Sequence, residues 1–244
     1  MSEFAFKEID QEGMDILNVI AEADKFNRWM YNTIAPYTKG RILEVGSGIG
    51  NISAFFLENN ATICLSDIRS NYCGYLERKF SGQKGVLGIL EMDLIDKDFD
   101  QKFSHLFNSF DSIFALNVVE HISDDDLAIS NSKKLLKTGG NLIILVPAYQ
   151  SLYNKFDKEL EHYRRYTKKK LTGLMGKHLE IIHSQYFNFA GIFGWFLSGS
   201  LMKKQTIPGG QMKLYNKLVP VFKVADKVMF NQMGLSVIAV GKKA

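Results

Sequence analysis

The sequence contains little proline or cysteine and no long apolar run. Only 4 of its 244 residues are proline and 2 are cysteine, which argues against a proline-rich linker protein and a disulfide-stapled secreted fold. No apolar run approaches the ~20 residues needed to cross a bilayer. The first residues, M-S-E-F-A-F-K-E, lack the basic and apolar blocks of a secretory signal. Cys64 and Cys73 form no metal-ligand pattern, so we predict a globular cytoplasmic protein without a metal site.

Charge is unevenly distributed along the chain. The net charge is +4, but residues 1–150 hold 14 Lys and Arg against 21 Asp and Glu, whereas residues 151–244 hold 16 against 5. A basic C-terminal part is typical of proteins with an anionic partner, which includes a carboxylate or phosphate on a substrate, a lipid surface and nucleic acid. A solvated lysine-rich face explains the same charge equally well.

Segments with helix and strand character alternate along the chain. A helical region over 14–35 is followed by Pro36, and a later helix is expected to begin at a Ser123 cap and end before Gly139. Such alternation predicts a parallel sheet covered by helices on both faces. Strands are expected at 42–45, 61–65, 86–90, 112–116, 141–146, 179–186 and 235–240, and further helices at 51–58, 72–80, 167–175 and 211–229.

Polar residues follow the first four predicted strands. Glycines at 46, 48 and 50 follow the first strand, and Asp67, Asp93 and Asn117 follow the next three. In open parallel sheets, ligands bind beyond the carboxyl ends of the strands. Asp67 lies 21 residues after Gly46, close to the ~20 expected of an acid that binds a ribose diol. The spacing G-x-G-x-G differs from the dinucleotide fingerprint, and no Lys-Ser/Thr follows it, so we predict a different adenosine compound.

The combination of these motifs resembles class I S-adenosylmethionine-dependent methyltransferases. L-E-V-G-S-G-I-G resembles the first motif of that family, L-S-D-I and E-M-D-L its acids after strands two and three, and A-L-N-V-V-E-H-I its segment after strand four. The resemblance covers residues 41–147. It implies a Rossmann-like α/β fold with a seven-stranded sheet in the order 3-2-1-4-5-7-6 and an antiparallel last strand. It also implies S-adenosylmethionine as cofactor and S-adenosylhomocysteine as product.

Roles in cofactor binding follow from this resemblance, position by position. Asp67 is expected at the ribose and Asp93 at the adenine, while Glu44 either braces the loop or meets the ligand ammonium. F-N-R-W-M-Y resembles the segment that closes over the cofactor, so that Trp29 or Tyr31 is expected there, although helix packing explains Trp29 as well. The remaining predicted cofactor residues belong to the same motifs: Gly46, Ser47, Gly48, Ile68, Leu94, Asn117 and Val119.

The acceptor side is predicted in residues 147–166, which resemble bacterial methyltransferases of the type 11 or 12 domains. Arg164 or Arg165 is expected to bind a carboxylate or phosphate, with a structural contact to Asp157 or Glu161 as the alternative. His162 and His121 are the two candidates for a general base. Tyr163 is placed with the catalytic candidates, and Tyr149 and Tyr166 with the substrate-binding ones.

The sequence predicts one methyltransferase domain over residues 1–244. It comprises an N-terminal cap helix (1–40), a cofactor-binding core (41–147), an acceptor-side region (148–232) and a final strand (233–244). The expected reaction is methyl transfer to a small anionic or lipid-linked acceptor, at oxygen. The apolar segment 187–202 is a candidate acceptor wall, a membrane contact or simple core. The alternatives are an RNA, nitrogen or carbon methyltransferase, a nicotinamide-dependent oxidoreductase, and a non-catalytic binding protein.

Overall fold

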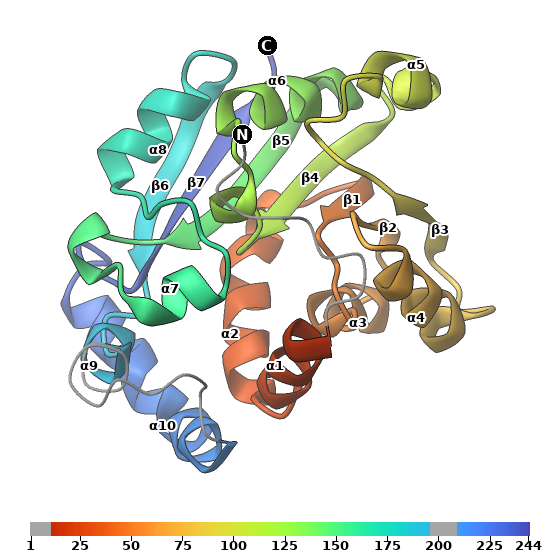
Figure 1. Ribbon diagram of the computed structural model, residues 1–244. Helices are drawn as coiled ribbons and strands as arrows, with labels where there is room; N and C mark the ends of the chain where they lie inside the picture. The colour runs from red at the N-terminus through yellow and green to blue at the C-terminus, as the bar shows by residue number, and fades with distance from the viewer. Residues whose placement is uncertain (1–10, 196–208) are drawn as a thin grey trace.

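The computed structural model describes residues 11–195 and 209–244, which form one seven-stranded sheet with helices on both faces (Figure 1). The strand order is β3-β2-β1-β4-β5-β7-β6, and β7 runs antiparallel to both of its neighbours. This confirms the order and the reversed last strand predicted from the sequence. The strands are β1 (Arg41–Val45), β2 (Thr62–Asp67), β3 (Val86–Glu91), β4 (Phe110–Leu116), β5 (Leu136–Pro147), β6 (Glu180–Phe187) and β7 (Ser236–Lys242).

The central strands are continuous apolar runs because both of their faces are covered. Ile42 and Leu43 are adjacent in β1 and both buried, yet they belong to hydrophobic clusters on opposite sides of the sheet. Successive side chains of a strand point to opposite faces, so two-sided burial requires apolar residues at every position. Helices α2, α3, α4 and α10 contribute side chains to one cluster, and α5, α6 and α8 to the other.

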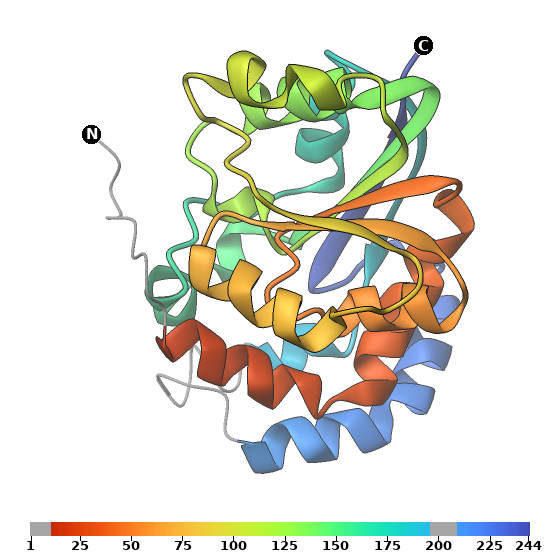
Figure 2. The same ribbon diagram turned by 90° about the vertical axis from the view of Figure 1, so that its right-hand side faces the viewer.

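Helices connect most of the strands and pack against the two faces of the sheet. Helix α10 is the outermost element on one side and lies beyond α1 (Figure 2). The α-helices are α1 (Gln11–Ala21), α2 (Asp24–Ile34), α3 (Asn51–Glu58), α4 (Ser70–Phe80), α5 (Phe99–Phe103), α6 (Asp125–Leu135), α7 (Lys155–Glu159), α8 (Lys168–Met175), α9 (Gly191–Trp195) and α10 (Gly209–Val228). Single 3-10 turns are η1 (Ala35–Tyr37), η2 (Ser104–Leu106), η3 (Val119–His121) and η4 (Gln150–Leu152).

Several element boundaries differ from those predicted. The expected helix over 14–35 is two helices, because the chain breaks at residues 22–23. Helix α6 is capped by Asp124, whose carboxylate accepts the N–H of Leu127, and not by Ser123. Strand β5 begins five residues earlier than expected. The short helices α5 and α7 were not predicted, since five residues are too few to show a helical period.

The apolar segment predicted as an acceptor wall or membrane contact is described in part. Residues 187–195 end β6 and form α9, and residues 196–202 lie outside the described ranges. Within residues 11–195 and 209–244, no helix is both long enough and apolar enough to span a bilayer.

Candidate active site

The glycine loop between β1 and α3 has a backbone that only glycine adopts without strain. Gly46, Gly48 and Gly50 have φ values of 70°, 54° and 76°, which lie in the left-handed region. A Cβ atom at Gly46 would lie 2.4 Å from Cγ2 of Val118. The loop therefore folds tightly against the segment after β4 and exposes backbone where side chains would otherwise stand.

Asp67 joins the end of β2 to the glycine loop. Its buried carboxylate accepts the N–H of Gly48 at 2.9 Å and that of Arg69 at 3.1 Å. Burial raises the pKa of Asp67, although both hydrogen bonds oppose the shift. The structure thus brings Asp67 and Gly48 together, as predicted, while the next residue, Ile68, lies exposed. An acid in this position is suited to accept hydrogen bonds from hydroxyl groups of a ligand above the loop.

Glu44 and Ser47 hold the loop from beneath. The hydroxyl of Ser53 in α3 donates to Oε2 of Glu44, which connects β1 to the helix after the loop. The N–H of Ser47 donates to the carbonyl of Ser66 at 2.8 Å, and its hydroxyl accepts the N–H of Ser66 at 3.1 Å. Burial raises the pKa of Glu44 to about 8. Of the two roles predicted for Glu44, the structure shows the brace.

Residues after β3 and β4 complete the same edge of the sheet. Asp93 is half-buried, and its Oδ1 accepts the N–H of Ile95 at 2.9 Å. The Leu94 side chain is part of the core. Asn117 is exposed with a φ of 55°, and Val119 is buried in the core, so that Val118 is the residue against the glycine loop. Strained backbone at an exposed polar residue is a common feature of functional sites.

Trp29 and Tyr31 of α2, which were predicted as cofactor contacts, both pack against aromatic side chains of other elements, and their contact with the cofactor stays a prediction. Trp29 is buried with its ring 4.4 Å from that of Phe187, and Tyr31 packs against Phe56 at 4.9 Å. The residue above the loop is Leu17 of α1, since a Cβ atom at Gly48 would lie 3.0 Å from its Cδ1. Sequence reasoning missed Leu17 because one leucine in an amphipathic helix carries no specific signal.

A buried polar network adjoins η3, at the end of β4. Asp157 lies at its centre: its Oδ1 is 2.8 Å from Nδ1 of His162 and accepts the Nε–H of Arg165 at 2.8 Å. Burial alone would raise the pKa of Asp157, but these hydrogen bonds outweigh it and hold the pKa below its usual value. The carboxylate therefore orients His162 by accepting its Nδ1–H, which leaves Nε2 as a proton acceptor.

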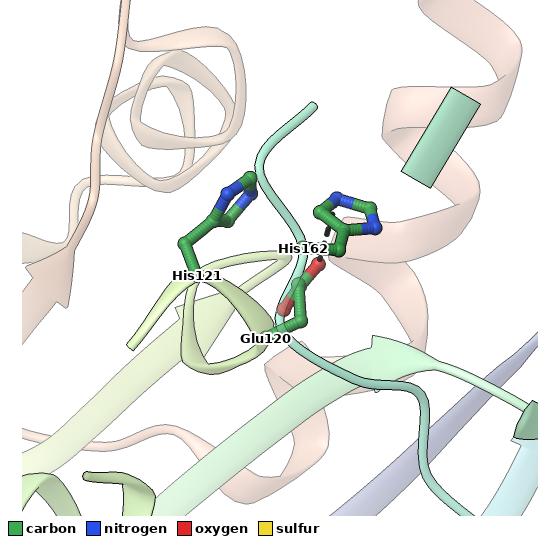
Figure 3. Close-up of side chains that lie close together, drawn as sticks. All are labelled: Glu120, His121 and His162. Atoms are coloured by element: carbon green, nitrogen blue, oxygen red, sulfur yellow. Dashed lines mark ion pairs between the residues drawn. The ribbon is translucent and has the colours of Figure 1, made fainter. Parts of the chain in front are cut away.

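Glu120 is fully buried beside this histidine. Its Oε1 lies 4.0 Å from Nε2 of His162, and neither carboxylate oxygen has a hydrogen-bond partner (Figure 3). Burial raises the pKa of Glu120 to about 8, although the charge of Arg165 opposes the shift. An unsatisfied buried carboxyl costs about 1–3 kcal/mol or more. The protonated form, which this shift favours, lowers the cost of burying the group.

His121 lies on the other side of His162, with ring centroids 4.6 Å apart and the rings edge to face. Although the residue keeps contact with solvent, loss of water around the ring lowers the pKa of His121, and the nearby His162 and Arg69 lower it further. Within the described residues, Glu120, His121 and His162 bring three potential ligand atoms within 4.8 Å of one another. The two predicted base candidates are thus neighbours in one cluster.

The arginines and tyrosines of the predicted acceptor segment are mostly committed to structural contacts. Arg165 is 2% exposed, and besides Asp157 it donates to the carbonyl of Ala148 at 3.1 Å. The hydroxyl of Tyr166, also fully buried, donates to Asp125 at 2.7 Å. This corrects the prediction of substrate contact for Arg165 and Tyr166, because neither side chain has a free surface. Arg165 instead takes the structural role that the sequence offered as the alternative.

The other three predicted acceptor-side residues keep partial exposure. Arg164 is 2.8 Å from Asp125 and donates to the carbonyl of Ser123 at 2.7 Å, which ties the segment to the start of α6. Tyr149 has a φ of 60° and stacks on Tyr186 with centroids 5.0 Å apart. The N–H of Tyr163 donates to the carbonyl of Glu120, which ties the backbone of this tyrosine to the segment that carries Glu120.

Comparison with known proteins agrees with this architecture. Residues 43–142 match the family model described as a methyltransferase domain. Lovastatin diketide synthase lovF of Aspergillus terreus is 28% identical over 113 residues, which are 44% of this chain and 4% of the synthase. The chain thus spans a small part of this curated relative's length.

Solved structures share the fold at low sequence identity. The cyclase SpnF aligns with a TM-score of 0.60 at 18% identity, over 89% of this chain and 81% of SpnF. Phosphoethanolamine N-methyltransferase 2 of Haemonchus contortus, in complex with phosphomonomethylethanolamine and S-adenosylhomocysteine, also aligns with a TM-score of 0.60 at 18% identity, over 92% of this chain and 57% of that one. One of these neighbours is a cyclase, so the fold alone does not define a reaction.

The match and the fold agree with each other. Residues 43–142 resemble a methyltransferase domain, and the sheet has the strand order and the reversed last strand that the resemblance to class I S-adenosylmethionine-dependent methyltransferases predicts. The likeness to a bacterial subgroup stays a prediction.

Proposed function

We propose that this chain transfers a methyl group from S-adenosylmethionine to an oxygen atom of a small or lipid-linked acceptor. The observation that carries the proposal is the contact between Asp67 and the loop at Gly48, which lies within the segment that matches the methyltransferase domain. The residues fit this cofactor: the loop presents backbone without side chains, and a buried carboxylate stands where the next strand ends. When bound, the cofactor supplies an electrophilic methyl group on a positively charged sulfur.

The residues at the strand ends would each bind a different part of the cofactor. Asp67 would accept hydrogen bonds from the ribose hydroxyls, and Asp93 would bind on the adenine side. Gly46 and Gly48 would lie along the methionine part, with Asn117 beneath it. Leu17 would cover the loop and exclude water, which favours a step in which charge is lost.

His121 and His162 are the two candidates for the base, and they differ in access: His121 reaches the surface, whereas His162 is buried. Because the Nδ1–H of His162 is held by Asp157, its Nε2 would take the proton of an acceptor hydroxyl that enters beside His121. Asp157 then stabilises the imidazolium that forms, as an oriented carboxylate does in other acid–base sites. Oε1 of Glu120 lies 4.0 Å from the same nitrogen, and the His121 ring packs edge to face against that of His162. Tyr163 follows His162 directly in the sequence and would line the path by which an acceptor reaches the histidines.

The charge distribution supports an acceptor that carries a carboxylate or phosphate. Residues 151–244 have an excess of eleven positive charges. With Arg165 committed to Asp157, the remaining candidates for direct contact are Arg164 and the surface lysines. The Haemonchus neighbour, which is crystallised with a phosphate-bearing compound, has the same fold. This agreement supports an anionic acceptor and leaves its identity to experiment.

Calorimetry tests the cofactor. We expect the chain to bind S-adenosylhomocysteine and not NADH, and the reverse result would favour an oxidoreductase. If the protein binds S-adenosylhomocysteine but transfers no labelled methyl group from S-adenosylmethionine to any component of a cell extract, it would be a binding protein.

The acceptor and the base require separate experiments. Mass spectrometry of a reaction with labelled cofactor and cell extract identifies which molecule gains the methyl group, and whether at oxygen, nitrogen or carbon. His162→Gln is expected to lower kcat by about 10²–10⁴-fold and to remove from the pH–rate profile the loss of activity that protonation of the base causes at low pH. A profile unchanged from the wild type would clear His162 of this role, and the same test applies to His121→Gln.

A further inference from the structure

Helix α10 exposes an apolar stripe to solvent along most of its length. Leu214, Val221, Val224 and Val228 are 59–67% exposed, and Leu218 is 40% exposed. Their spacing of four, three, three and four residues places them on one side of an α-helix. A contiguous exposed stripe of this kind differs from scattered surface apolar residues and indicates a surface that contacts something else.

The opposite side of the helix already supplies its contacts to the fold. Val219 is buried in the core, and the ring of Tyr215 lies 5.6 Å from that of Phe26 in α2. The Asp226 carboxylate accepts the N–H groups of Asn188 and Phe189, both at 2.7 Å, which fixes α10 to the end of β6. The exposed stripe is therefore a second apolar face on a helix that is anchored to the fold by its other side.

The charges that α10 itself places beside the stripe are positive. Lys217 lies four residues before Val221, and Lys227 lies three residues after Val224, so both lysines are neighbours of the stripe on the helix surface. Lys213, near the start of the helix, is 68% exposed and pairs only loosely with Glu22 of α1, at 3.4 Å. The single acid within α10 is Asp226, which is buried and bound to the backbone.

This combination of chemistry favours a lipid surface over a second copy of the chain. A two-fold contact through the stripe would bring the lysines of two helices together without an acid on either helix to pair with them, which is unfavourable. At an anionic bilayer, the valines and leucines would enter the boundary between headgroups and acyl chains while the lysines bind phosphates. The structure has no spanning helix in its described part, so the contact would be peripheral.

We propose that α10 is a membrane-docking helix that binds the surface of anionic phospholipid bilayers. The proposal rests on the exposed face of α10 and not on the methyltransferase reaction. Combined with that reaction, it favours a lipid-linked acceptor over a freely soluble one. Trp195, whose Nε1–H donates to the carbonyl of Leu152, links the α9 segment beside α10 to the acceptor segment.

Flotation with lipid vesicles tests this proposal on the full chain. We expect binding to phosphatidylcholine vesicles that contain phosphatidylglycerol, weaker binding at high salt, and little binding to phosphatidylcholine alone. The double variant Val221→Ser/Val224→Ser is expected to bind the anionic vesicles at least about tenfold more weakly, because it removes apolar area from the contact. Lys217→Glu/Lys227→Glu should weaken binding and reduce its salt dependence.

Two controls keep the result interpretable. Leu127→Ser changes an exposed apolar residue on α6 and should leave vesicle binding unchanged. Each variant should retain the thermal midpoint and the S-adenosylhomocysteine affinity of the wild type, which separates docking from folding and from the proposed reaction. The proposal is overturned if the wild type does not float with anionic vesicles, if it binds neutral vesicles equally well, or if the double variant abolishes a dimer in place of vesicle binding.

Discussion

Oδ1 of Asp157 lies 2.8 Å from Nδ1 of His162 within a region closed to solvent. The same oxygen is 2.8 Å from Nε of Arg165. One carboxylate thus orients a histidine and neutralises a buried cation, so that the stability of the acceptor segment and the state of the histidine depend on one residue. The sequence offered Asp157 as a structural partner of Arg165, but nothing in it predicts that the same carboxylate also holds His162.

Asp157→Asn is expected to lower the free energy of unfolding by about 3–5 kcal/mol, because it leaves the Arg165 charge buried without its partner. Urea unfolding at neutral pH measures this. The matched control is Asp126→Asn, which removes a similar acid–histidine contact to His178 at 3.1 Å on the exposed surface. That change should cost much less, because water and salt screen the exposed pair. Similar losses in the two variants would contradict the structural role of Asp157.

Asp67→Ala is expected to weaken S-adenosylhomocysteine binding by about ten- to a hundredfold, because hydrogen bonds to a charged group each contribute about 1.5–3 kcal/mol. Isothermal calorimetry provides the measurement. Asp98→Ala, in the loop before α5, is the control and should leave the affinity unchanged. If both variants bind as tightly as the wild type, Asp67 serves the loop alone.

Glu44→Gln is expected to make stability less sensitive to pH. Burial raises the pKa of Glu44 in the folded state to about 8, above its value of ~4.3 in an unfolded chain. The folded state therefore retains a proton that the unfolded state releases, and this favours unfolding as pH rises from ~4.5 through about 8. Thermal unfolding of the wild type and the variant is to be measured between pH 5 and 8, which lies within this range of pH. The midpoint temperature of the variant should fall less over these values than that of the wild type. An identical loss would show that Glu44 does not titrate in this range.

Gly50→Ala and Gly173→Ala are expected to change stability in opposite directions. Gly50 has a φ of 76°, and a Cβ there would lie 2.4 Å from Cε2 of Phe80, so alanine should cost at least about 1–2 kcal/mol. Gly173 lies within α8 with nothing near its Cβ position, and alanine there should stabilise the protein by up to about 1 kcal/mol. Denaturant unfolding of the two variants compares them, and a stabilised Gly50→Ala would disprove the strain argument.

The sequence predicted the sheet because its strands carry their own signal. A continuous apolar run such as β4 predicts a strand that is buried on both faces. The polar residue after each strand indicates the edge of the sheet at which ligands are expected. Packing between distant segments has no such signal. The contact of Val118 with Gly46, the cover of Leu17 over Gly48 and the burial of Arg165 depend on how separate elements meet. From the sequence alone, an arginine near a histidine is equally able to bind a substrate or to form a structural ion pair. Only the position of its partner acid in the fold decides between the two.

The reversed strand has a consequence for how the molecule is made. Strand β7 separates β5 from β6, and it follows both of them in the chain. During synthesis, β6 therefore has no place in the sheet until residues 236–242 have emerged and inserted between the two earlier strands. Pairing of such widely separated segments is slow compared with local structure. The edge of the sheet that carries β6 would consequently form after strands β1 to β5 have paired.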